Sequence, residues 1–179
     1  PKYDKHNFLI HDYFFAKALD KVRPGGIIAF ITSKGTMDKE NNSVRKYIAE
    51  RAELIGAIRL PNTAFKANAN TDVTADIIFL QKRERVQVSE ANWLHVSKTS
   101  DGVPINEYFL DNPEMLLGKM VFDQRMFGEG SRYTALVNNE ENFDLSEALN
   151  KAVQNLSANI SSFERELEGK QENIISADP

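Results

Sequence analysis

The sequence predicts an α/β fold: the distal half of a doubly wound sheet, with a small α+β extension and a C-terminal helix. The first observation behind this is the alternation of amphipathic helical segments with short apolar runs between residues 8 and 85. The second is a polar loop directly after an apolar run, at the end where α/β sheets bind ligands. The third is a capping motif at residues 144–147 that opens an acidic helix.

The first helix is predicted from about Asn7 to Val22, and a short strand follows it. Apolar residues recur there at spacings of three and four, which places Phe15 and Leu19 on one face. Pro24 ends the helix because it cannot continue one, and the two glycines after it let the chain reverse. The continuous apolar run Ile27–Ile31 then predicts a strand covered on both faces.

A second helix is predicted within Asn42 to Ala52, and two further strands at Leu54–Leu60 and Ala75–Leu80. Residues 61–74 form a long polar loop between these strands, and such a loop in a compact domain is either functional or disordered. The sequence does not define the strand order. Half a sheet leaves one strand edge exposed, so we expect the isolated chain to self-associate through that edge.

Past residue 85 the pattern becomes irregular, and we divide the chain into a partial α/β domain (1–85), an α+β extension (86–140) and an acidic helix and tail (141–179). The extension is predicted to contain a strand, two helical turns and a hairpin. In chain order these are Trp93–Val96, Ile105–Leu110, Pro113–Leu117, and Lys119–Asp123 paired with Tyr133–Val137 through Gly128-Glu129-Gly130.

The C-terminal helix is predicted to begin at Asp144, with Glu147 three residues later as a capping box. Its apolar stripe suits a packing helix or a short coiled coil. The stripe comprises Leu145, Leu149, Leu156, Ile160, Phe163 and Leu167. One interpretation of the whole chain is therefore a non-catalytic interaction module that docks a partner through this helix.

The composition is that of an ordinary soluble protein, with 41% hydrophobic and 27% charged residues and no membrane-spanning run. Cysteine is absent, which removes disulfides and thiolate sites and fits a cytoplasmic location. The three histidines are too scattered to suggest a metal site. The net charge is −4, but residues 137–179 carry nine acidic and three basic side chains, so residues 1–136 have a net charge of +2. The mildly basic part allows a polyanionic partner.

Four segments carry a resemblance to a known family: RPGGIIAFITS, ELIGAIRLPNTAF, TDVTADIIFLQK and INEYFLDNPEMLLGKM. Their order resembles the second half of the catalytic domain of adenine-specific DNA methyltransferases, of the methylase–helicase type found in phages and mobile elements. The resemblance is close over residues 8–85 and looser over residues 86–145. It implies a Rossmann-like sheet and an enzyme that acts in DNA methylation and restriction–modification.

The resemblance also implies S-adenosylmethionine as cofactor and double-stranded DNA as substrate. In that family the target adenine is flipped out of the duplex and its amino nitrogen attacks the sulfonium methyl group. The family's glycine-rich cofactor loop and Pro-Pro-aromatic motif do not occur in this sequence. We therefore expect the carboxyl-terminal half of a catalytic domain, inactive alone, with the N-terminal half of the same protein as its partner.

The resemblance assigns candidate roles to seven residues, each beside a plainer alternative. Phe65 matches the aromatic wall that stacks on the flipped base, with Asn62 beside it, unless Phe65 is a loop anchor in the core. Ser33, Lys34, Thr36 and Lys66 are candidate DNA contacts, unless they belong to solvated loops. His11 matches a position near the cofactor, or is a partly buried structural histidine. A third, weaker interpretation is a nucleotide-binding domain that uses the Gly128 turn.

Overall fold

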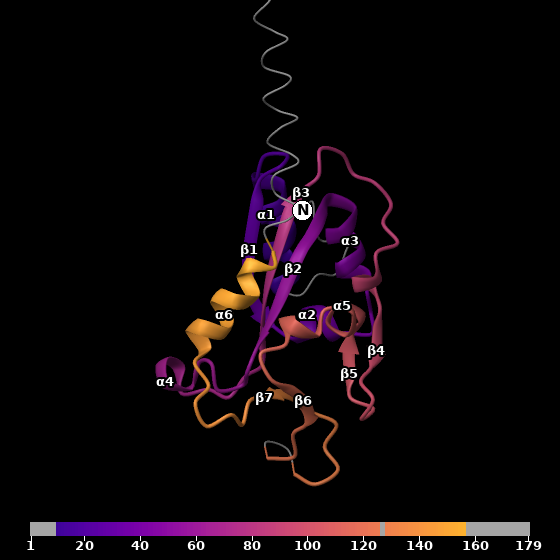
Figure 1. Cartoon of the computed structure of the whole chain (residues 1–179). Helices are drawn as coiled ribbons and strands as arrows, with labels where there is room; N and C mark the ends of the chain where they lie inside the picture. The colour runs from indigo at the N-terminus through magenta and orange to yellow at the C-terminus, as the bar shows by residue number, and fades with distance from the viewer. Residues whose placement is uncertain (1–9, 126–127, 157–179) are drawn as a thin grey trace, which may run out of the picture.

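The computed structural model describes residues 10–125 and 128–156 and has a mixed α/β architecture (Figure 1). Helices and strands alternate through the first half of the chain, as the hydrophobic periodicity predicts. In chain order the elements are α1 (Ile10–Lys21), β1 (Ile27–Ser33), α2 (Gly35–Asp38), α3 (Ser43–Arg51), β2 (Ala52–Leu60), α4 (Lys66–Ala69) and β3 (Ala75–Lys82).

In the described part of the chain the main sheet has three strands in the order β1-β3-β2. The middle strand β3 is antiparallel to both neighbours, so β1 and β2 run parallel to each other. In the register, Ile77 of β3 lies between Ile31 of β1 and Ile58 of β2. A bulge between Leu54 and Gly56 shifts the register near the start of β2.

Helices α1 and α3 cover one face of this sheet. Phe15 of α1 packs on Phe30 of β1 with ring centroids 4.3 Å apart, and Ile48 of α3 is buried in the same core. The core continues without a break through residues of the extension, such as Phe109, to Leu156 after α6. The hydrophobic contacts therefore join the three segments into which the sequence was divided, although the boundaries themselves stay a prediction.

The prediction that β1 is covered on both faces is wrong. Its residues alternate between exposed and half-buried along the whole strand, and Ile31 is 62% exposed. β1 pairs only with β3 among the described strands, so it is an edge strand with one apolar face open to solvent. A continuous apolar run shows that a segment is hydrophobic, but it does not show that both faces of the strand are buried. Here no described element packs on the second face of β1.

The extension is more regular than predicted. Residues 93–96 were predicted to form a strand, but they form a 3₁₀ turn and the start of a strand. Successive side chains of a strand point to opposite faces, whereas Trp93 and Leu94 are both buried. The hairpin is confirmed, with β6 and β7 antiparallel. The elements are η2 (Asn92–Leu94), β4 (Val96–Lys98), β5 (Pro104–Asn106), α5 (Glu107–Asp111), η3 (Pro113–Met115), β6 (Lys119–Phe122) and β7 (Thr134–Val137).

The extension pairs with the outer edge of β2 at Arg59, near the end of the strand. The Leu117 N–H donates to the Arg59 carbonyl at 3.1 Å, and Leu116 forms a parallel bridge with Arg59. Next to this contact, Gly118 lies so close to β7 that a Cβ there would be 2.4 Å from the Val137 carbonyl oxygen. Among the described residues, the extension thus covers the β2 edge at Arg59, whereas no strand pairs with the outer edge of β1.

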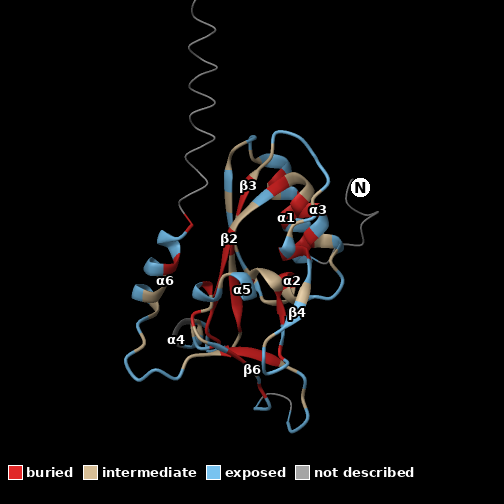
Figure 2. Ribbon diagram, turned by 45° about the vertical axis from the view of Figure 1, so that its right-hand side comes forward, coloured by how far each residue is buried: buried red, intermediate tan, exposed pale blue. Residues whose placement is uncertain are grey.

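Helix α6 (Leu145–Gln154) lies on the side of the sheet opposite α1 and α3 (Figure 2). Asp144 caps it as predicted, because its carboxylate accepts from the Glu147 N–H at 2.9 Å. Leu156 reaches β2 at Gly56, where a Cβ would overlap its side chain. The predicted stripe residues Ile160, Phe163 and Leu167 lie outside the described residues.

The basic run at the end of β3 serves the fold. The Lys82 ammonium donates to the Leu19 carbonyl near the C-terminus of α1, where a cation offsets the helix dipole. The Arg83 guanidinium donates to the Ala49 carbonyl at 3.1 Å and pairs with Glu53 at 2.7 Å. Lys82 and Arg83 are therefore helix-terminus contacts, a role that their sequence did not reveal.

We predict that Gly118→Ala destabilises the protein, because the new methyl group meets a backbone carbonyl that cannot rotate away. The expected loss is about 1–3 kcal/mol in the free energy of unfolding, measured by chemical denaturation. Gly35→Ala is the matched control, since the nearest atom to its Cβ would be the Ser33 Oγ at 3.6 Å. Equal stability of the Gly118 variant and the wild type would contradict the close approach.

We also predict that the isolated chain self-associates through β1, because an open apolar strand edge pairs readily with another copy. Ile31→Lys places a charge on the exposed face of this strand and is expected to shift the protein toward monomer in light scattering. Val88→Lys, at an 83% exposed apolar residue outside the sheet, is the control and should change nothing. A monodisperse wild-type monomer would refute the prediction.

Candidate functional site

Three segments of the chain converge at one end of the main sheet. Since β1 and β2 are parallel and β3 is antiparallel, the carboxyl ends of β1 and β2 lie beside the amino end of β3. Thr74, which is buried, joins the segments: its carbonyl accepts from the Lys34 N–H at 3.2 Å, and its hydroxyl accepts from the Leu136 N–H at 2.9 Å. The Asn62 N–H donates to the Leu136 carbonyl at 2.8 Å. We call this region the sheet end.

A fully buried arginine lies beneath the sheet end. The Arg59 guanidinium binds Asp76 through N–O distances of 2.7 and 2.8 Å, and Asp38 through distances of 2.7 and 3.0 Å. Its Cζ lies 4.4 Å from the ring centroid of Phe109. One guanidinium thus joins β2, β3, α2 and α5, and paired hydrogen bonds of this kind fix the orientation of both carboxylates.

The charges of this cluster oppose the cost of burial. Burial lowers the pKa of Arg59, but the charges and hydrogen bonds of Asp76 and Asp38 outweigh it and raise that pKa above its ordinary value. Burial raises the pKa of the Asp76 carboxyl, and Arg59 opposes this. We assign the ionised state, because the short paired contacts match a charged fork on charged carboxylates.

A second buried arginine holds the turn after β1. The Arg45 guanidinium donates to the carbonyls of Thr36, Lys39 and Leu94 at 3.1, 2.6 and 3.1 Å. Asn106 adds to this, since its side-chain amide donates to the carbonyls of Met37 and Trp93 at 2.7 and 2.8 Å. Helix α2 is therefore held from three sides, by Arg45, Asn106 and the Arg59 cluster.

Sequence reasoning missed these supporting residues. The available signal was a charged residue inside each of two apolar strands, Arg59 in β2 and Asp76 in β3. Opposite charges in adjacent buried strands suggest an ion pair, since an unpaired buried charge is costly. Arg45 and Asn106 gave no such signal, because helices and loops carry polar residues at exposed positions as a rule.

Lys34 and Thr36, both predicted to contact DNA, take different positions in the structure. Lys34 is half-buried, and its ammonium lies 5.5 Å from the ring centroid of Tyr133. Burial lowers the Lys34 pKa, while the charges of Asp38 and Asp76 oppose that shift. Thr36 is only 8% exposed, and its hydroxyl hydrogen-bonds that of Thr32 at 3.0 Å. This burial counts against a DNA contact by Thr36, whereas Ser33 is exposed at the strand end.

Phe65 and Asn62, the predicted base-binding residues, both lie on the segment after β2. Phe65 is half-buried and packs against the hydrophobic core at the start of α4, so the loop-anchor alternative keeps physical support. Asn62 is almost fully buried at 3% exposure. The predicted long loop contains the short helix α4, which ends at Asn70 in the left-handed conformation, φ 49°.

Lys66, the fourth predicted DNA contact, is exposed and pairs with Asp72 at 3.5 Å. The other carboxylate oxygen of Asp72 is buried and has no hydrogen-bond partner within the structure. His11, the predicted cofactor contact, is exposed on α1. The alternative of a partly buried structural histidine is therefore wrong.

The Gly128 turn does not form a nucleotide-binding loop. The Gly128 N–H donates to the Gln124 carbonyl and the Ser131 N–H donates to that of Gly128, and strand β7 follows. A phosphate-binding glycine loop opens a helix instead, whose N-terminus binds the anion. Within residues 128–137 this turn therefore lacks the helix N-terminus that binds a phosphate, and residues 126–127 before it lie outside the described residues.

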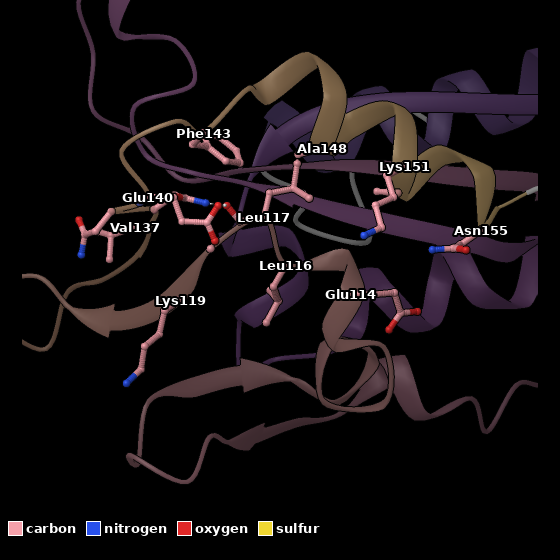
Figure 3. A pocket seen from close by; sticks show the side chains of 14 residues that line it. Glu114, Leu116, Leu117, Lys119, Val137, Glu140, Phe143, Ala148, Lys151 and Asn155 are labelled. Carbon is pink, nitrogen blue, oxygen red and sulfur yellow. Dashed lines mark hydrogen bonds between the residues drawn. The ribbon is translucent and has the colours of Figure 1, made fainter.

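A separate cleft of about 720 Å³ lies between α6, the segment around η3 and the loop after β7 (Figure 3). Leu116 and Phe143 contribute apolar surface, and Glu114, Lys119 and Lys151 contribute charges of both signs. It contains none of the residues predicted from sequence to bind DNA, base or cofactor. Among the described residues, no helix is long and apolar enough to cross a membrane, and no group of three potential metal ligands occurs.

The structure therefore places this protein in the class of mixed α/β domains. Its candidate site consists of polar and aromatic residues near the carboxyl ends of two parallel strands. Comparison with known families narrows the class. The chain matches the family described as N-6 DNA Methylase over residues 4–151, and it belongs to that family. The match includes the main sheet, the extension and most of α6.

A similar curated protein is "Defense against restriction protein B" of Escherichia phage P1. The two sequences are 30% identical over 86 residues, which is 48% of this chain and 4% of the phage protein. The chain therefore spans only a small part of the length of that relative. No solved structure matches the chain.

We predict that Arg59→Met destabilises the fold by about 3–5 kcal/mol, because it leaves two buried carboxylates without their cation. Burial then raises the pKa of Asp76 in the folded state above its unfolded value of about 4. Because the unfolded state loses this proton first, the loss of unfolding free energy relative to the wild type should grow as the pH rises above about 4. Denaturant titrations at several pH values measure both effects.

Lys119→Met is the matched control for Arg59→Met, since it breaks a surface pair with Asp101 at 3.0 Å. The expected change for that variant is at most about 1 kcal/mol. A similarly small loss for Arg59→Met would show that the cluster does not hold the sheet end together.

Proposed function

We propose that this chain is the base-side portion of an S-adenosylmethionine-dependent, adenine-specific DNA methyltransferase. Membership of the N-6 DNA methylase family supports the reaction class. The observation that carries the proposal is the sheet end, where Lys34 directly follows β1 and the segment with Asn62 and Phe65 follows β2. Ligands in open α/β sheets bind at this end.

The target base is proposed to lie against Phe65, whereas the 3% exposure of Asn62 counts against its predicted base contact, as burial does for Thr36. A flipped base needs an aromatic or apolar surface for stacking and polar groups for its edge. Phe65 is half-buried, so its ring has one side on the core and retains accessible surface at the start of α4. Catalytic residues that contact the amino group are assigned to the preceding half of the domain, and this chain alone is proposed to be inactive.

The cofactor site is proposed to lie mainly in that preceding half. Within this chain only the exposed His11 of α1 is a candidate contact with S-adenosylmethionine. The open edge of β1 supports such a partner, because an edge strand with an apolar face suits pairing with a further strand. The complete sheet would then be doubly wound and Rossmann-like.

Double-stranded DNA is proposed to approach the sheet end along Ser33, Lys34 and Lys66. The ammonium groups would contact phosphates, which gives affinity without sequence selection. The name of the phage relative, which refers to defense against restriction, suggests that methylation by the parent protein serves protection of DNA in the cytoplasm. Carriage on a mobile element is part of the same proposal.

The alternative of an interaction module receives less support. Helix α6 uses its apolar face within the fold, since Ala152 and the nearby Leu156 are buried and Leu145 and Leu149 pack against the core. A surface consumed by the fold is not free for a partner. The alternative therefore depends on residues 157–179, which lie outside the described residues.

We predict that Phe65→Ala in the full-length parent protein lowers the rate of methyl transfer about 10- to 100-fold, as expected from the loss of one base-stacking contact. Affinity for S-adenosylmethionine should not change. Single-turnover transfer of a labelled methyl group and equilibrium cofactor binding measure the two quantities. Phe143→Ala is the control, because Phe143 also packs half-buried on the core but lies beside α6. Unchanged turnover of the Phe65 variant would remove its proposed role.

A further inference from the structure

Lys34 and Tyr133 come from distant parts of the chain and meet at the sheet end. Lys34 precedes α2, and Tyr133 precedes β7 of the hairpin. The Lys34 ammonium nitrogen lies 5.5 Å from the centroid of the Tyr133 ring. A lysine ammonium within about 6 Å of an aromatic face is attracted by the ring's electron density. The ring therefore limits the positions that this flexible side chain can take.

Backbone contacts fix both partners of this pair. The Lys34 N–H donates to the Thr74 carbonyl at 3.2 Å. On the hairpin side, the Asp123 N–H donates to the Tyr133 carbonyl at 2.8 Å, and the Leu136 N–H donates to the Thr74 hydroxyl at 2.9 Å. Thr74 thus sets the distance between the turn that carries Lys34 and the strand that follows Tyr133.

Lys34 is half-buried, and both burial and the positive charge of Arg59 lower its pKa, so an external anion would stabilise the charged ammonium. Its nearest acidic influences are Asp38 and Asp76, but Arg59 already holds both carboxylates in paired hydrogen bonds. Within the described residues Lys34 makes no ion pair of its own. An ammonium without a fixed counter-ion, held at the rim of a sheet end, suits a phosphate oxygen.

Another cation, Arg125, lies on the same hairpin as Tyr133. The Arg125 side chain is 70% exposed, and Asp123 accepts from its Nε at 3.1 Å and from its backbone N–H at 3.0 Å. The Nη2 of Arg125 also donates to the other Asp123 oxygen at 3.3 Å, so this guanidinium and carboxylate form a pair with two side-chain hydrogen bonds. The hairpin thus carries a guanidinium paired with Asp123 and, through Tyr133, contacts the Lys34 ammonium.

We propose that Tyr133 is a positioning residue that holds the Lys34 ammonium toward a phosphate of the DNA backbone. The inference rests on the proposed function and deepens it, because it brings the β6–β7 hairpin into the DNA-binding surface. In Figure 1 this hairpin lies at the end of the sheet that carries α2 and α4, well away from α1.

The test measures binding of the 179-residue chain to a fluorescently labelled DNA duplex. Fluorescence anisotropy gives the affinity at each of a series of salt concentrations. Lys34→Met should weaken binding and lower the slope of log affinity against log salt by about 0.9, the value for one phosphate contact. Tyr133→Leu should weaken binding about two- to fivefold, in keeping with one exposed cation–π contact. Tyr133→Phe keeps the ring and should bind like the wild type.

A double-mutant cycle separates positioning from a general structural effect. If Tyr133 acts through Lys34, then Tyr133→Leu has no further effect in the Lys34→Met background. The matched control pair is Tyr13 and Lys17 on α1, where the ammonium lies 5.6 Å from the ring. Tyr13→Leu and Lys17→Met should leave both affinity and salt slope unchanged.

Each contrary outcome has a distinct meaning. Weakened binding by Lys34→Met without any effect of Tyr133→Leu overturns the positioning role. Wild-type binding that neither variant changes overturns the Lys34 contact and leaves the proposed function standing. No binding by the wild-type chain contradicts its proposed DNA-binding surface and this inference together. If Tyr133→Leu does not fold, the NMR chemical shifts of the Lys34 side-chain protons test the contact instead. An adjacent aromatic ring should move these shifts upfield in the wild type and in Tyr133→Phe. Shifts without this displacement would overturn the contact between Lys34 and Tyr133.

Discussion

Arg59 lies fully buried at the carboxyl end of β2 and holds one carboxylate from the middle strand and one from α2. Asp38, the carboxylate from α2, also accepts from the Asn106 N–H at 3.0 Å, so the extension joins the same network. A buried charge is tolerated only when it is paired and hydrogen-bonded. These elements therefore cannot move apart without exposing or orphaning a charge, and the geometry of the sheet end depends on this constraint.

The two edges of the sheet differ in a way that bears on function. Residues 116–117 pair with the outer edge of β2 at Arg59, whereas among the described residues β1 offers an open edge and exposes Ile31 on one face. An open apolar edge in a domain with a well-packed core is a liability unless another strand covers it. The proposed contact between this edge and a preceding half of the domain would cover it.

Much of the local structure could be predicted. The strands β2 and β3, the helix α3, the β6–β7 hairpin and the Asp144 cap all follow from hydrophobic periodicity and capping chemistry. The candidate site was predicted only as a location. Its supporting residues, Arg45, Arg59 and Asn106, depend on contacts between segments far apart in sequence, which periodicity does not report.

The sequence by itself determined the order and type of the main elements and, through its motifs, the family. Short-range spacing carries this information, because helix and strand periods are local properties. Only the tertiary structure decided that β3 lies between β1 and β2, that Thr36 is buried, and that Tyr133 meets Lys34. These features follow from strand pairing and from the packing of a hairpin against a distant turn, and neither leaves a repeating pattern in the sequence.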